Sequence, residues 1–87
     1  MTARSVTIRN KTGLHIRPAS LLVATANRFQ STVRVAAGER EADGRSILSL
    51  MLMELAPGAE IVIHAEGGDE EQAADALAAL VESGFSE

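Results

Sequence analysis

The 87-residue chain contains no cysteine, tryptophan or tyrosine, and Phe29 and Phe85 are its only aromatic residues. The absence of cysteine excludes disulfides and fits a reducing cytoplasm, where we expect the protein. Because 46% of the residues are hydrophobic and so few are aromatic, the core has to be mainly aliphatic. The length suffices for one domain, which we expect to span residues 1–87.

Long apolar runs are also missing. The longest uninterrupted run, residues 76–81, is far too short to cross a membrane. No apolar stretch follows Arg4 near the N-terminus, so we expect no signal peptide and no membrane insertion.

Basic residues are absent from the second half of the chain. Residues 1–45 contain all eight basic residues and three acidic ones, a net charge of +5, whereas residues 46–87 contain nine acidic residues, a net charge of −9. The overall charge of −4 and the lack of stacking aromatics argue against a nucleic-acid partner. The basic half would steer an acidic partner toward His15, with chance segregation of charge as the alternative.

Hydrophobic periodicity predicts four strands and three helices. Alternation of apolar and polar residues predicts strands over Ser5–Arg9, Thr32–Val35, around Arg40–Ala42, and over Ala59–Glu66. Helical spacing and end signals predict helices over Ile16–Phe29, over Ile47–Leu55, and after Asp69, which with Gln72 forms an expected capping box before a stop at Gly84. This βαββαβα order predicts an α+β fold, a two-layer sandwich of sheet and helices.

One segment, residues 13–20, combines a histidine with features of an anion site. Gly13 permits an unusual backbone angle just before His15, and Pro18 is tolerated only within the first turn of a helix. The first N–H groups of that helix, near residues 16 and 17, lack helical partners and attract anions. Arg17 adds a planar set of donors suited to phosphate oxygens. The segment therefore indicates reversible phosphorylation of an imidazole, against the plainer alternative of a surface histidine.

The sequence Gly-Leu-His-Ile-Arg-Pro-Ala-Ser over residues 13–20 resembles the active-site signature of HPr, the histidine-containing phosphocarrier protein of the bacterial sugar phosphotransferase system. A second stretch, which includes Glu39, Arg40 and residues 44–48 and continues through Leu50, Met53 and Glu54, resembles that family's serine-site signature. The resemblance spans the whole chain. It implies an open-faced sandwich, a four-stranded antiparallel sheet covered on one face by three helices.

The resemblance implies a stoichiometric carrier rather than a turnover enzyme. His15 would accept a phosphoryl group on Nδ1 from phosphorylated Enzyme I and pass it to IIA domains of sugar permeases. Arg17 would neutralise charge during transfer. The hydroxyl of Thr12 would orient the imidazole, or Thr12 is only a turn residue. We expect a monomer, since a shuttle has to expose one face to successive partners.

Ser46 stands where a helix cap is favoured, and in some members of the family the serine here is phosphorylated by an HPr kinase/phosphorylase. The sequence leaves open whether Ser46 is a cap alone or also a regulatory site. The helix after Ser46 is apolar nearly all round and would leave part of its surface exposed. The family's docking face matches six positions, each with burial in the core as its alternative: Ser20, Leu21, Ala24, Ile47, Leu48 and Met51.

Ile16 departs from the family pattern, which usually has a small residue directly after the histidine. We expect this bulkier side chain to alter the fit of partners without abolishing the chemistry. Two functional alternatives stay open: a regulatory, nitrogen-type carrier that signals to IIA-like proteins without sugar transport, and an interaction domain that is never phosphorylated.

Other classes of site find little support. We expect no metal ion, because there is no cysteine and no pair of histidines has ligand spacing. His64 is expected to be an exposed strand residue. Gly67 and Gly68 lack the rest of a nucleotide-binding fingerprint, so no cofactor is expected.

Overall fold

The computed structural model describes residues 1–86 of the chain. Four strands and three helices follow one another in the expected order, βαββαβα, and a short 3₁₀ turn ends the described chain. The elements are β1 (Thr2–Thr7), α1 (Ile16–Ala26), β2 (Thr32–Ala37), β3 (Arg40–Asp43), α2 (Ile47–Met51), β4 (Glu60–Glu66), α3 (Glu70–Glu82) and the 3₁₀ turn Gly84–Ser86.

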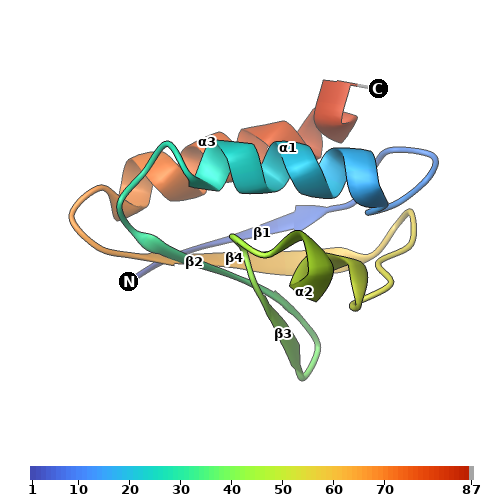
Figure 1. Cartoon of the computed structure of the whole chain (residues 1–87), viewed down its shortest axis with the longest axis horizontal. Helices are drawn as coiled ribbons and strands as arrows, with labels where there is room; N and C mark the ends of the chain where they lie inside the picture. Colours follow the sequence, from blue (N-terminus) through green and yellow to red (C-terminus); the bar gives the residue numbers. More distant parts are fainter. Residues whose placement is uncertain (87) are drawn as a thin grey trace.

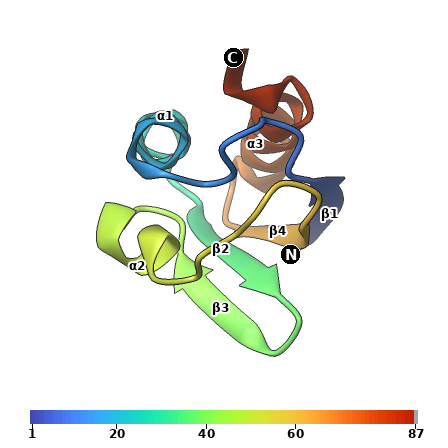
Figure 2. The same cartoon turned by 90° about the vertical axis from the view of Figure 1, so that its right-hand side faces the viewer.

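The strands form one antiparallel sheet in the order β1-β4-β2-β3. Helices α1 and α3 lie side by side over one face of the sheet, and α2 packs beside them against α1 and β3 (Figures 1 and 2). The other face of the sheet carries no helix. The expected two-layer, open-faced sandwich is therefore confirmed.

The core lies between the sheet and the helices. Residues of the inner sheet face alternate with exposed ones, as in Val33 and Val35 on β2 or Ile61 and Ile63 on β4. Leu22, Leu50 and Leu77 bring one buried leucine from each helix. The core is aliphatic as expected, with Phe85 as the one aromatic residue of its main cluster.

Several element ends differ from the sequence-based expectations. Strand β1 begins at Thr2 and ends at Thr7, because Ile8 already exchanges hydrogen bonds with Gly58 and Ala59 in the loop before β4. Helix α1 ends at Ala26 and not at Phe29, since the N–H groups of Arg28 and Phe29 donate to carbonyls three residues back.

Helix α2 is likewise shorter than expected. It ends at Met51, and Met53 and Glu54 continue with bonds to carbonyls three residues back. Glu54 then takes a positive φ of 51°, which turns the chain away well before Pro57.

The capping box expected at Asp69 and Gln72 is wrong. Asp69 does precede α3, but its side chain makes no bond to that helix. The carboxylate instead accepts hydrogen bonds from the N–H groups of Gln30 and Ser31 and from the Ser31 hydroxyl, and so ties α3 to the α1–β2 connection. Gly84, with φ of 69°, does follow the end of α3 as expected.

Candidate functional site

The loop between β1 and α1 is held against the α2–β4 connection. The N–H of Leu14 donates to the Leu55 carbonyl over 2.9 Å, and the Asn10 side-chain amide donates to the Gly13 carbonyl. Gly13 has φ of 70°, and a Cβ there would lie 2.5 Å from the Leu55 oxygen. Glycine is therefore required both by the backbone angle and by the close approach.

His15 is the residue at which α1 begins. Its backbone is extended, with φ of −94° and ψ of −170°, and its carbonyl accepts the first helical bond from the N–H of Ala19. Ile16 and Arg17 are thus the first two helical residues, as expected, and Pro18 is the buried third. The positive end of the α1 dipole lies beside a half-buried imidazole.

An open pocket of about 410 Å³ lies at this helix start. Thr12, His15, Arg17 and Leu21 line it from the β1–α1 loop and from α1, and Phe85 and Ser86 line it from the end of the described chain. The imidazole therefore shares one pocket with the exposed guanidinium of Arg17, as the sequence predicted. Thr12 is also present, and its hydroxyl accepts a hydrogen bond of 3.4 Å from the Asn10 amide.

Phe85 and Ser86 are the two pocket residues that the sequence did not predict. They lie about seventy positions from His15 in the chain, and no periodic pattern links the two segments. The one available signal is Gly84, whose positive φ lets the chain fold back toward the β1–α1 loop after α3. A buried aromatic at the end of the chain then fixes that return.

Large apolar side chains are exposed on α1, on α2 and directly after α2, and one of them, Leu21, also lines this pocket. We define the apolar patch as Ile16, Leu21, Ile47, Leu48 and Leu52, which are 63%, 43%, 37%, 69% and 69% exposed. Of the residues expected at a docking face, Leu21, Ala24, Ile47 and Leu48 are exposed, Ser20 is half-buried, and Met51 is half-buried against the core.

Ser46 caps α2, as expected, because its hydroxyl accepts a hydrogen bond from the N–H of Ser49 over 3.1 Å. The preceding residue, Arg45, donates to the carbonyls of Phe29 and Ser31 over 2.7 and 2.6 Å and to the Asn27 side-chain oxygen over 3.3 Å. Arg45 thus joins the start of α2 to the end of α1.

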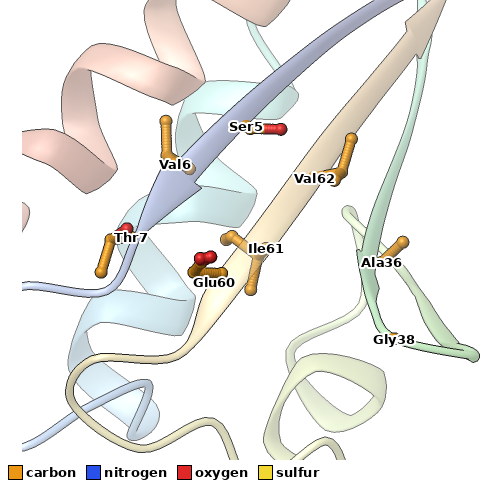
Figure 3. A pocket seen from close by; sticks show the side chains of 8 residues that line it. All are labelled: Ser5, Val6, Thr7, Ala36, Gly38, Glu60, Ile61 and Val62. Carbon is orange, nitrogen blue, oxygen red and sulfur yellow. The ribbon is translucent and has the colours of Figure 1, made fainter.

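A separate pocket of about 310 Å³ opens between β1, β4 and the end of β2. Figure 3 shows its lining, in which Glu60 is the one titratable side chain and most others are small. His64 lies elsewhere on the helix-free sheet face, paired in register with Arg34, and is half-buried instead of exposed as expected.

Within residues 1–86, no three His, Cys, Asp or Glu side chains are grouped so that they could hold a metal ion. None of the helices in that range is long and apolar enough to span a bilayer.

Comparison with known proteins places this chain in a family. The model of the family described as "PTS HPr component phosphorylation site" matches residues 2–83. Phosphocarrier protein NPr of Proteus mirabilis (strain HI4320) is 44% identical over 85 residues, which cover 97% of this chain and 94% of that protein.

Two solved structures are also similar to this chain. HPr of Thermoanaerobacter tengcongensis is 41% identical, with a TM-score of 0.95 over 100% of this chain and 98% of that one. Crh of Bacillus subtilis, described as a dimer with a swapped domain, is 39% identical, with a TM-score of 0.78 over 97% of each chain. The chain thus belongs to the HPr family and is a phosphocarrier protein of the bacterial phosphotransferase system.

Proposed function

We propose that His15 carries the phosphoryl group, accepting it from phosphorylated Enzyme I and delivering it to IIA domains of sugar permeases. One observation supports this most: the imidazole, the Arg17 guanidinium and the start of α1 meet at one open pocket. Cationic side chains and free helix N–H groups are the kinds of group that stabilise phosphoryl charge, and this supports the proposal.

Each transfer exchanges one P–N bond for another. The lone pair of His15 Nδ1 attacks phosphorus, while the bond to the donor imidazole breaks and leaves its electron pair on the donor nitrogen. No proton has to move, because each imidazole keeps its proton on the other ring nitrogen. Arg17 and the first N–H groups of α1 stabilise the charge on the equatorial oxygens, which is the main task in phosphoryl transfer.

The experiment is to incubate the protein with Enzyme I and ³²P-labelled phosphoenolpyruvate. We expect label that is stable to alkali and labile to acid. His15→Ala should abolish labelling, whereas His64→Ala, which removes the other histidine, should keep it. Labelling that survives in His15→Ala would contradict the proposal, and unlabelled wild-type protein would favour an interaction domain without phosphorylation.

A nitrogen-type, regulatory carrier is the second candidate function, because a relative that is 44% identical is an NPr protein. The two functions differ in the acceptors. A sugar carrier passes label to IIA domains of sugar permeases, whereas a regulatory carrier labels only IIA-like signalling proteins. A panel of both kinds of acceptor, each incubated with the labelled protein, separates the two.

The proposed partners dock on the apolar patch together with Ser20, Ala24 and Met51. A monomer exposes this surface to each partner in turn, and light scattering of the purified protein tests that state against a dimer such as Crh. We place the carrier in the cytoplasm, because phosphoenolpyruvate is a metabolite of that compartment.

Ser46 is proposed as a regulatory site for an HPr kinase/phosphorylase. A phosphate on its half-buried hydroxyl would add negative charge beside Ile47 and Leu48, where an acidic partner would be repelled. The kinase with labelled ATP should mark wild-type protein and Ser49→Ala but not Ser46→Ala. Absence of label in wild-type protein would leave Ser46 as a helix cap.

A further inference from the structure

Ile16 is the member of the apolar patch that is next to His15 in the chain. It is the first residue of α1, directly follows His15, and is 63% exposed. A large β-branched side chain in water beside a reacting group gains nothing for the fold, because it is not packed in the core. A partner that docks at His15 would bury it.

The side of α1 that carries Ile16 faces α2. Residues 16, 20, 23 and 27 recur at helical spacing and share one side of the helix. At the far end of that side, the Asn27 side chain accepts a hydrogen bond from Arg45, which immediately precedes α2. Ile16 is therefore at the other end of the side that faces α2.

The chain that leaves α2 returns to the start of α1. The chain enters α2 next to Asn27 and, after leaving α2, meets the start of α1 where the Leu14 N–H donates to the Leu55 carbonyl. Leu52, which directly follows α2 and is 69% exposed, comes between these two contacts in sequence and lines a separate pocket with Arg40, Glu41 and Ser49.

Ile16 has fewer side-chain conformations than an unbranched residue. Branching at Cβ restricts its χ1 rotamers, and as the first residue of α1 it has no preceding helical turn that would select a single one. Phosphoryl transfer requires the reacting atoms to come within about 3–3.5 Å, and an error of about 1 Å can cost about 10²-fold in rate. A stiff branched side chain beside His15 therefore limits which surfaces can approach closely enough.

We propose that Ile16 selects the phosphotransferase partners of this carrier, admitting those that have an apolar recess beside their own reacting histidine. Such a partner buries Ile16 and binds more tightly. Other partners have a flat surface beside their reacting histidine, which suits a carrier with a small residue after its own histidine. Ile16 would keep the reacting histidine of such a partner too far from His15. This inference rests on the proposed transfer through His15 and adds the shape of the partner.

The test compares Enzyme I proteins from two organisms as donors. The first is from the organism that makes this protein, and the second is from an organism whose carrier has alanine after the histidine. For Ile16→Ala, we expect KM to rise about 10-fold with the first donor, with kcat nearly unchanged, since the lost contact is equal in ground and transition states. With the second donor we expect kcat/KM to rise by a similar factor. Ile16→Val, which keeps the β-branch, should preserve most of the selection.

Leu52→Ala is the matched control, because Leu52 belongs to the same patch and is equally apolar and exposed. Leu52→Ala should raise KM with both donors and leave the ratio of the two KM values unchanged. If Ile16→Ala leaves both KM values within twofold of wild type, or moves both in one direction, Ile16 does not select partners. Wild-type protein that neither donor phosphorylates would overturn the proposed function itself. Thermal unfolding of Ile16→Ala should match wild type, since Ile16 lies outside the core.

Discussion

Gly13 determines how the chain enters α1 at His15. An alanine would face the penalty of a positive φ and a contact of 2.5 Å with the Leu55 oxygen, so Gly13→Ala should lower the free energy of unfolding by about 2–3 kcal/mol. Gly38 is the control, because its φ of 62° is similar but no atom lies within 4 Å of a Cβ there. Gly38→Ala should cost only about 1 kcal/mol in urea unfolding. Equal losses would show that the close approach to Leu55 is unimportant.

Arg17 should act on the rate of transfer more than on binding. Arg17→Gln removes donors from the charge that develops on the phosphoryl oxygens, and single-turnover transfer from Enzyme I should slow about 10²-fold. Arg17→Lys keeps the charge without the planar fork and should slow transfer less. Arg28→Gln is the control, since Arg28 is an exposed cation next to the end of α1 and outside the pocket. A similar loss in both Gln variants would assign the effect to net charge.

Residue by residue, the local part of the site could be predicted from the sequence. His15, Arg17 and Pro18 lie within four positions, so the short chain segment keeps them near the same helix start. Phe85 and Ser86 could not be predicted, because their approach to His15 depends on the packing of α3 against the sheet. Tertiary structure decides such contacts, and no local pattern records them.

Helices α1 and α2 are joined through Arg45. Its guanidinium donates to the Asn27 side-chain oxygen at the end of α1 and to two carbonyls in the α1–β2 connection, and bonds from a charged donor contribute more than neutral ones. Arg45→Ala should therefore lower the free energy of unfolding by about 2 kcal/mol. Arg40→Ala, at an exposed arginine on β3, should change it by less than about 0.5 kcal/mol. Chemical denaturation of both variants measures the difference, and a neutral Arg45→Ala would mean that water replaces these bonds at no cost.

Periodicity and end signals predict all four strands and all three α-helices, but neither several of their ends nor the 3₁₀ turn Gly84–Ser86. Strand β4 was predicted from the alternation around Ile61 and Ile63, which reflects one buried face. Asp69 was expected to cap α3, but Ser31 and Gln30 recruit its carboxylate from across the fold. A carboxylate near a helix start accepts hydrogen bonds from whichever N–H and O–H groups lie closest in the folded protein, and the sequence does not show which groups these are.

At the scale of the whole molecule, two carboxylates before and within α3 join distant parts of the chain. Hydrogen bonds from Ser31 and Gln30 hold the pKa of Asp69 below its usual 3.8. Hydrogen bonds from Thr2 and the N-terminal ammonium, with one from Gly67, lower the pKa of Glu70 from 4.5 to about 2. Both groups therefore bind protons more weakly in the folded than in the unfolded chain.

The direction of the pH effect on stability follows from the linkage between proton binding and folding. Depressed folded-state pKa values give stability that is present above the unfolded values and is lost as pH falls through the folded ones, here between pH of about 4.5 and 2. Urea unfolding at stepped pH should show this decline. Glu70→Gln should be less stable at neutral pH, and its free energy of unfolding should decline less steeply as the pH falls. Glu71 is an exposed neighbour, so Glu71→Gln should follow the wild-type curve. Parallel curves for wild type and Glu70→Gln would exclude Glu70 as a source of acid sensitivity.

The His15 pocket, at the start of α1, has a kinetic consequence for the proposed function. In the proposed transfer, donor and acceptor both dock at this pocket, so we expect no ternary complex of Enzyme I, carrier and IIA domain. Every turnover would then pass through free phosphorylated carrier, and the relay would follow a ping-pong scheme. The concentration of that diffusing species, shared among all acceptors, sets how they compete for phosphoryl groups.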